Sequence, residues 1–169
     1  MPLNLIKQYN ALLELNSMNS NQRDDSLNGV FNQDIVNNRS FVFRAKRIHP
    51  TPKDDGSIAM DNLFNHLTRK EVDKKTKARE FDNHRSIRIH WIKHHVDERK
   101  SSNMLVYSVK EPNGNRTYIY DKDEKYVIVL EPLRVNEEYY LLTAFPVMGK
   151  DAARNKYEKK YKRRLPDVL

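Results

Sequence analysis

The segment from Arg79 to Lys100, REFDNHRSIRIHWIKHHVDERK, gathers the side-chain types that cut a phosphodiester without a metal ion. Histidines titrate near neutral pH and can act as general acid or base. Three of them flank the only tryptophan of the chain: His90, His94 and His95 around Trp91. Arginine binds phosphate through paired N–H donors and stabilises charge that builds on it, and the segment offers Arg85 and Arg88.

Each of these residues also has a plain structural interpretation. Neighbouring histidines in a basic segment are more often solvated surface than a site, and a tryptophan is most often core. His90 and His94 have the spacing of metal ligands on one helix, but no HExxH glutamate accompanies them, so we predict no metal site. Arg88 lies between two isoleucines and needs a partner, either a phosphate or a structural ion pair with Glu131 or another acidic residue of the sheet.

The apolar residues of the segment fit two secondary structures. One set alternates as in a half-buried strand, and another recurs as on one face of a helix. The alternating set is Ile87, Ile89 and Trp91, and the helical set is Ile89, Ile92 and Val96. The helix accounts for more residues, so we predict it, with Asp82 or Asn83 as its cap. It would align Arg88, His95 and Arg99 in one basic row.

From Met104 onward the apolar period changes to two, as in strands. Four runs rich in Val, Ile, Tyr, Leu and Thr are separated by turn signals: MLVYSVKEP, RTYIYDKD, KYVIVLEPL and EYYLLTAFPV. Asn113-Gly114 is a favourable hairpin turn, and connections this short require antiparallel neighbours. We therefore predict a four-stranded antiparallel meander whose third run is central and covered on both faces.

The chain before this meander is predicted to be mainly helical. The apolar pattern predicts an amphipathic helix at residues 3–18 and another at 61–72. Residues 17–40 are rich in Asn, Ser, Asp and Gln and are predicted to be a loop or linker, and the FVFRAKRI run after them is a strand or a short helix. Helices packed on such a sheet give an α+β fold, with an N-terminal helix and linker at 1–40 and one α+β domain at 41–169.

The end of the chain is strongly basic. Residues 150–164 carry eight Lys or Arg against two acidic residues. Tyr157 and Tyr161 have the spacing of one aromatic stripe on a helix, so we predict a basic C-terminal helix or tail. Their rings, together with that of Trp91, could stack on RNA bases while Lys159 and Lys162 contact phosphates. The alternative is a solvated helix face.

The composition favours an anionic partner. A formal net charge of +8 in 169 residues and an isoelectric point near 9.6 point to nucleic acid. The absence of cysteine excludes disulfides and thiolate chemistry. No apolar run is long enough to span a bilayer and the first residues lack the build of a signal peptide, so we expect no membrane partner and a cytoplasmic location. No GxxxxGK, GxGxxG or GxSxG motif supports nucleotide-cofactor or serine-hydrolase chemistry.

The order of four motifs resembles a known nuclease superfamily. REFD..RS.RIHWI, YVIVLEP, YYLLTAF and the basic tail are similar, over about residues 41–162, to the phage-type nucleases of the barnase–EndoU–colicin–RelE superfamily. The resemblance implies a metal-independent endoribonuclease without a cofactor, of the toxin or phage type, that cleaves RNA by attack of the 2′-hydroxyl on the adjacent phosphate. It also implies the cytoplasm of a bacterial host, with an antitoxin or host protein as a further partner.

The resemblance assigns roles to individual residues. The positions carried over are Arg85, Arg88, Trp91, Thr143 and Lys159. The two arginines would bind the scissile phosphate, and one of His90, His94 and His95 would be the acid or base, a choice that the sequence leaves open. The main alternative is a non-catalytic protein that binds RNA or DNA. A third is a phage–host interaction protein that kept the fold and lost the chemistry.

Overall fold

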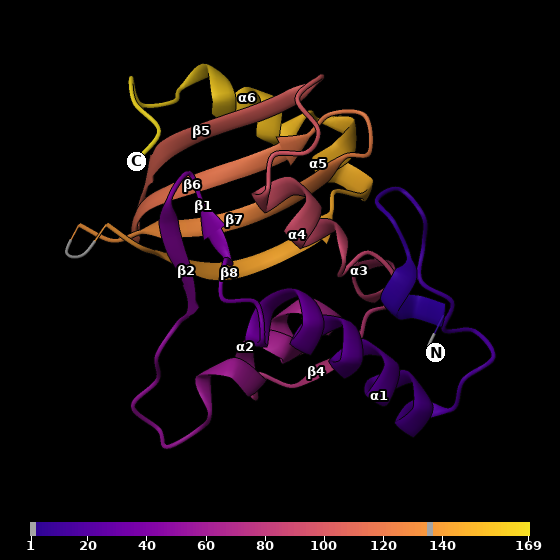
Figure 1. The fold of residues 1–169 in the computed structure, drawn as a ribbon. Coiled ribbons are helices and arrows are strands. Elements are labelled where there is room, and N and C mark those ends of the chain that lie inside the picture. The colour runs from indigo at the N-terminus through magenta and orange to yellow at the C-terminus, as the bar shows by residue number, and fades with distance from the viewer. Residues whose placement is uncertain (1–2, 135–136) are drawn as a thin grey trace.

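A curled six-stranded sheet forms the centre of the computed structural model, which describes residues 3–134 and 137–169 (Figure 1). Its strands follow the order β1-β2-β8-β7-β6-β5. They are β1 (Val42–Phe43), β2 (Lys46–Pro50), β5 (Met104–Glu111), β6 (Gly114–Asp121), β7 (Tyr126–Pro132) and β8 (Tyr139–Pro146). A separate two-stranded sheet pairs β3 (Arg69–Glu71) with β4 (Arg79–Phe81).

The predicted four-stranded antiparallel meander is wrong as a description of the sheet. The four runs are present as β5 to β8, and neighbours among them are antiparallel. The sheet then continues past β8 into β2 and β1, and β2 runs parallel to β8 with Ile48 opposite Tyr139. The sheet is therefore mixed. A parallel pair joins segments that are distant in sequence, and the FVFRAKRI run gives no local sign of its partner.

The helices are short and pack on both faces of the sheet. They are α1 (Ser20–Phe31), α2 (Ala59–Thr68), α3 (Asn83–Ser86), α4 (Trp91–Val96), α5 (Gly149–Ala153) and α6 (Lys156–Lys162). Apolar residues of α1, α2 and α4 share one core cluster with Ile128 and Leu130 of β7. Tyr157 of α6 shares a second cluster with Val127 and Val129. The third run is thus central and covered on both faces, as predicted. Within the described residues, each helix is too short or too polar to cross a bilayer.

The predicted helix at residues 3–18 is also wrong. Only a 3₁₀ turn at Leu3–Ile6 forms there, and the chain then runs without helix to α1. Its backbone is held by the rest of the domain: Trp91 Nε1 donates to the carbonyl oxygen of Ala11 at 3.1 Å. The backbone N–H of Leu13 donates to the carbonyl oxygen of Ile87 at 3.0 Å. These tertiary hydrogen bonds replace the ones a helix would make within itself.

The polar stretch at 17–40, predicted as a linker, is mostly helical. It contains α1 and a π-helix at Asn32–Val36. The start of α1 is a capping box, in which Asn19 and Gln22 each accept a hydrogen bond from the other's backbone N–H. Leu27 and Phe31 of this helix lie in the same core cluster as the sheet residues. The stretch therefore packs on the domain.

The segment 79–100 forms two short helices in place of the predicted single one. Asp82 caps α3, as predicted, by accepting a hydrogen bond from the backbone N–H of Arg85. Between α3 and α4 the backbone tightens into three-residue turns, such as Trp91 N–H to the Arg88 carbonyl oxygen at 2.9 Å. Because this turn rotates α4 relative to α3, the basic row expected along a continuous helix does not form.

Candidate functional site

The guanidinium group of Arg85 and the hydroxyl group of Thr143 lie side by side at the edge of the main sheet. Arg85 Nη1 lies 3.4 Å from Thr143 Oγ1 and donates to the backbone carbonyl oxygen of His66 at 2.8 Å. Arg85 Nε lies 3.5 Å from Asp82 Oδ2, and the guanidinium covers the ring of Phe145 at 5.3 Å. Its side chain is only 15 % exposed, so its position is fixed before any ligand arrives.

A β-bulge in β8 directs Thr143 toward this edge. Thr143 is opposite Val129, while Leu141 is opposite Leu130, so Leu142 is the extra residue in the strand. Bulges redirect side chains and interrupt regular pairing. The pairing of β2 with β8 reaches only as far as Leu141, which leaves the rest of that edge to α2 and α3. The predicted meeting of an arginine from the helical part with the last strand therefore occurs for Arg85.

His66, in the last turn of α2, is a candidate that sequence reasoning missed. Its carbonyl oxygen accepts from Arg85, and Thr143 Oγ1 lies 3.5 Å from the same oxygen. Burial, followed by the charges of Arg79, Lys53 and Arg85, lowers the pKa of His66 below its ordinary value. His66 is therefore neutral at pH 7 and able to accept a proton. Its local sequence gives no signal beyond a polar residue beside the apolar positions of α2.

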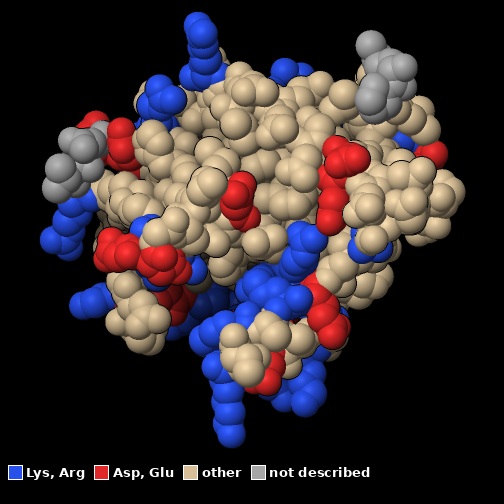
Figure 2. Space-filling view, turned by 90° about the horizontal axis from the view of Figure 1, so that it is seen from below, with Lys and Arg blue, Asp and Glu red and all other residues tan. Residues whose placement is uncertain are grey.

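We call Lys53, His66, Arg79 and Arg85 the basic cluster, because their charges interact around one imidazole. Figure 2, which views the molecule from below, shows Lys and Arg gathered along one edge of this face with Asp and Glu among them, and α2 and β4 lie on this lower side in Figure 1. Asp82 is the carboxylate paired with Arg85, and Glu71 also lies close enough to affect His66. The cluster suits a polyanion.

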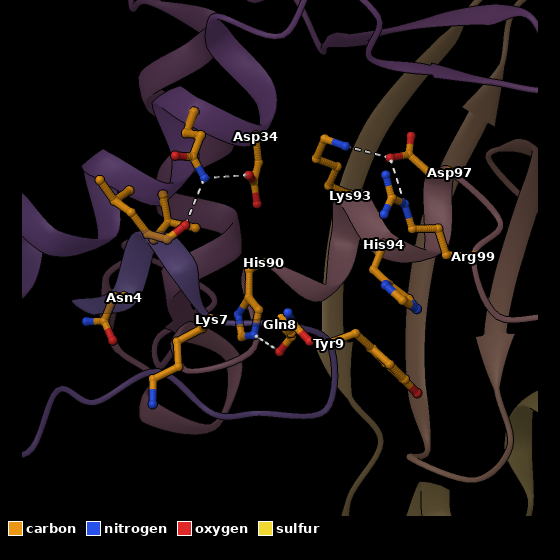
Figure 3. Close-up of a pocket in the computed structure, with 13 residues that line it drawn as sticks. Asn4, Lys7, Gln8, Tyr9, Asp34, His90, Lys93, His94, Asp97 and Arg99 are labelled. Atoms are coloured by element: carbon orange, nitrogen blue, oxygen red, sulfur yellow. Dashed lines mark hydrogen bonds and ion pairs between the residues drawn. The ribbon is translucent and has the colours of Figure 1, made fainter. Parts of the chain in front are cut away.

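His90 and His94 lie apart from this cluster and line a cavity of about 530 Å³ (Figure 3). His90 is buried, and its Nε2 lies 3.1 Å from the carbonyl oxygen of Gln8. The ring of His94 stacks on Tyr9 with centroids 4.1 Å apart. Burial, followed by the charges of His95 and Arg99, lowers the pKa of His94 to about 4. Both imidazoles have lowered pKa values, and neither contacts Arg85 or Thr143.

His95 faces the interior of the domain. It is 1 % exposed, and its Nε2 lies 3.2 Å from Oδ2 of Asp121, which is fully buried. The same carboxylate accepts from Lys100 Nζ at 2.7 Å and from the hydroxyl of Tyr9. Burial alone would raise the pKa of Asp121, but hydrogen bonds from His95, Lys100 and Tyr9 outweigh it and hold the pKa well below its usual range. This arrangement stabilises the fold. Because the His95 ring is buried, it cannot reach an RNA substrate, and the predicted acid or base role does not fit it.

Arg88 does not join Arg85 at Thr143, contrary to the prediction that both bind one phosphate. Its Nη1 donates to the carbonyl oxygen of His84 at 2.6 Å, and its guanidinium covers the ring of Trp91 at 5.3 Å. The alternative ion pair with Glu131 is absent as well, since Glu131 lies 3.5 Å from Arg116. Trp91 is 1 % exposed, so its ring is core and is closed to an RNA base.

The basic tail forms α6, and Tyr157 and Tyr161 lie on one side of it, as predicted. Tyr157 is 4 % exposed and packs in the second core cluster, so only Tyr161 retains a partly exposed ring. Lys159 and Lys162 are exposed. The α6 helix packs on β5, whereas Thr143 lies on β8, three strands away in the sheet order, and neither lysine is among the charges that act on His66.

Comparison with protein-family models, with curated proteins and with solved structures gives no significant match. Functional assignment therefore depends on the chemistry of the sites described above.

Proposed function

We propose that this chain binds RNA through the basic cluster, with Arg85 and Thr143 holding a backbone phosphate. The observation that carries the proposal is the fixed pair of donors at the sheet edge, where Arg85 Nη1 lies 3.4 Å from Thr143 Oγ1. Both groups donate hydrogen bonds to phosphate oxygens in protein–nucleic acid contacts. Lys53 and Arg79 add charge around them. Because Arg85 is held by Asp82 and by the His66 carbonyl, little side-chain entropy is lost on binding.

Cleavage of the bound RNA is the second candidate function, and its candidate base is the half-buried imidazole of His66, which the charges of Lys53, Arg79 and Arg85 surround. In this reaction His66 takes the proton of a 2′-hydroxyl, and the oxygen attacks the adjacent phosphate while the bond to the 5′-oxygen breaks. The departing 5′-oxygen takes a proton from water and leaves as a 5′-hydroxyl. Arg85 and Thr143 stabilise the charge on the phosphorane. This is the metal-independent ribonuclease chemistry that the resemblance to phage-type nucleases implies. In this proposal the general base lies on α2 and is none of His90, His94 and His95.

Salt-dependent RNA binding tests the first function. Single-stranded, labelled RNA is titrated with the full chain at several salt concentrations, and the comparison uses two exposed lysines, Lys53 and Lys122. Lys53→Ala should weaken binding and reduce the slope of log K against log salt by about 0.7, because one phosphate contact is lost. Lys122→Ala, the same change in the β6–β7 turn, should leave the slope unaltered. Equal effects of the two substitutions would contradict a localised site.

Incubation of the RNA with the protein in EDTA tests the second function. Cleavage to products with 2′,3′-cyclic phosphate ends should appear in wild type and disappear in His66→Asn with RNA binding retained. Binding without any cleavage would leave the chain as a non-catalytic RNA-binding protein. Cleavage that persists in His66→Asn would show that another group is the base.

A further inference from the structure

The cavity lined by His90 and His94, which we call the His90–His94 cavity, has no part in the function proposed above. It lies between the N-terminal segment, the π-helix and α4 (Figure 3). Its volume of about 530 Å³ is in the range of pockets for small molecules, roughly 300–1,000 Å³. Three different kinds of group form its wall, and they lie on separate elements.

The first is a buried carboxyl group with few partners. Asp34, in the π-helix, is 8 % exposed. Among the described residues its side chain has one hydrogen bond, from Gln33 Nε2 at 3.4 Å, which is long. Burial raises the pKa of Asp34, and the Gln33 hydrogen bond and Lys93 offset this only in part. A buried carboxyl group so weakly paired would gain from N–H donors on a ligand.

The second is a set of cations that outnumber the carboxylates. Lys7, Lys93 and Arg99 line the cavity together with Asp34 and Asp97. Asp97 is shared, since its Oδ2 lies 2.6 Å from Lys93 and 3.9 Å from Arg99. Figure 3 shows Lys93 and Arg99 both directed at Asp97 along one side of the cavity. Lys7 is paired with Glu14 outside this set, at 3.1 Å, so Lys93 and Arg99 share the single carboxylate of Asp97. An anionic group on a ligand would therefore lie against Lys93 and Arg99, and chiefly against Arg99, whose contact with Asp97 is the longer one.

The third is a rigid pair of rings. Tyr9 and His94 are stacked with an interplanar angle of 10°, and the Tyr9 hydroxyl is anchored on Asp121. With a pKa near 4, the His94 imidazole is uncharged at neutral pH and presents an aromatic surface. Rings fixed in this way suit contact with a flat heterocycle, because no side-chain freedom is lost.

We infer that the His90–His94 cavity binds a purine mononucleotide, with guanine as the preferred base. The Asp34 carboxylate would accept from N1–H and the 2-amino group of guanine. The phosphate would lie against Lys93 and Arg99, and the base would pack on the Tyr9–His94 pair. Adenine presents an acceptor where guanine presents N1–H, so it would lose this recognition. The inference does not require RNA binding at the basic cluster.

Calorimetric titration of the full chain at pH 7 with GMP, AMP and inorganic phosphate tests the inference. GMP should bind at least about tenfold more tightly than AMP, the equivalent of one hydrogen bond to a charged group. Phosphate alone should bind more weakly than either nucleotide. Because this comparison uses the wild-type protein, it stays decisive even if a variant fails to fold. Equal affinities for GMP and AMP, or no binding of GMP at millimolar concentration, would overturn the inference.

Two substitutions then separate base recognition from phosphate binding. Asp34→Asn should remove most of the preference for GMP and leave AMP affinity unchanged. Lys93→Ala should weaken both nucleotides. Asp61→Asn, the same change at an exposed position in α2, should alter neither. A preference for GMP that survives Asp34→Asn in the folded protein would exclude the proposed contact. RNA affinity, measured in parallel, reports on the basic cluster alone.

Discussion

Asp121 should be one of the most costly positions at which to remove a charge. Its carboxylate is fully buried, accepts hydrogen bonds from Tyr9 and Lys100, and lies 3.2 Å from His95 Nε2. It also accepts from the backbone N–H groups of Asp123 and Glu124, at 3.0 and 3.2 Å. Asp121→Asn preserves the volume and an acceptor oxygen but leaves the Lys100 ammonium, which is 16 % exposed, without its buried counter-charge.

Removing one partner of a buried ion pair costs about 3–5 kcal/mol, and we expect about 3 kcal/mol here because Lys100 retains Asp123 and some solvent. That loss should lower Tm by about 6–12 °C in a domain of this size. The pKa of Asp121 is depressed in the folded state, so its stabilisation is present above the unfolded pKa of about 3.9 and is lost as pH falls below it. Stability of the variant should therefore vary less with pH below about 4.

Urea unfolding monitored by tryptophan fluorescence measures this directly, because Trp91 is buried. The matched control is Asp123→Asn, which removes a carboxylate 2.9 Å from the same lysine but 50 % exposed. That change should lower the free energy of unfolding by less than about 1 kcal/mol, because exposed ion pairs contribute no more than this to stability. If Asp121→Asn also costs less than about 1 kcal/mol, or if both variants lose the same amount, the buried network is not a source of stability.

Three further predictions follow from other sites. Asn19→Ala should destabilise the chain by about 1 kcal/mol through loss of the α1 cap, measured by urea unfolding; no change would mean that the capping box is dispensable. Arg85→Lys should weaken RNA about tenfold in a binding titration, because paired donors are lost while charge is kept; unchanged affinity would exclude the contact. Any cleavage should keep its kcat/KM to below pH 6.5, because the pKa of His66 is lowered in the free protein, and a midpoint above 6.5 in the kcat/KM profile would exclude His66 as base.

Local patterns in the sequence predicted the strands well and the sheet poorly. Alternation and turn signals located β5 to β8, and the continuous apolar run identified β7 as central. The pairing of Ile48 with Tyr139 joins positions that no local pattern connects, so the mixed sheet could not be read from the sequence. The capping box formed by Asn19 and Gln22 has a recognisable sequence pattern, but the polar residues around it favoured the prediction of a linker.

The candidate site was predicted in part. The proximity of Arg85 to Thr143 was expected. The β-bulge that directs Thr143 to the edge of the sheet has no recognisable signal in the sequence. His66 was missed because its neighbours Lys53, Arg79 and Arg85 come from separate stretches of the chain. The histidines around Trp91 were grouped by sequence, yet His90 and His94 line one cavity away from Arg85 while His95 faces Asp121 in the interior. Tertiary contacts decided each of these outcomes.

The N-terminal segment has a consequence for the order of folding during synthesis. The hydrogen bond from Tyr9 to Asp121 closes a loop of 112 positions. The hydrogen bond from the backbone N–H of Leu13 to the carbonyl oxygen of Ile87 also joins positions far apart in the chain. Contacts so distant in sequence form late, because the entropy of the long loop is lost before they can form. On the ribosome, residues that emerge early therefore remain without their partners until β6 has been translated, and the start of this chain is locked in place near the end of folding.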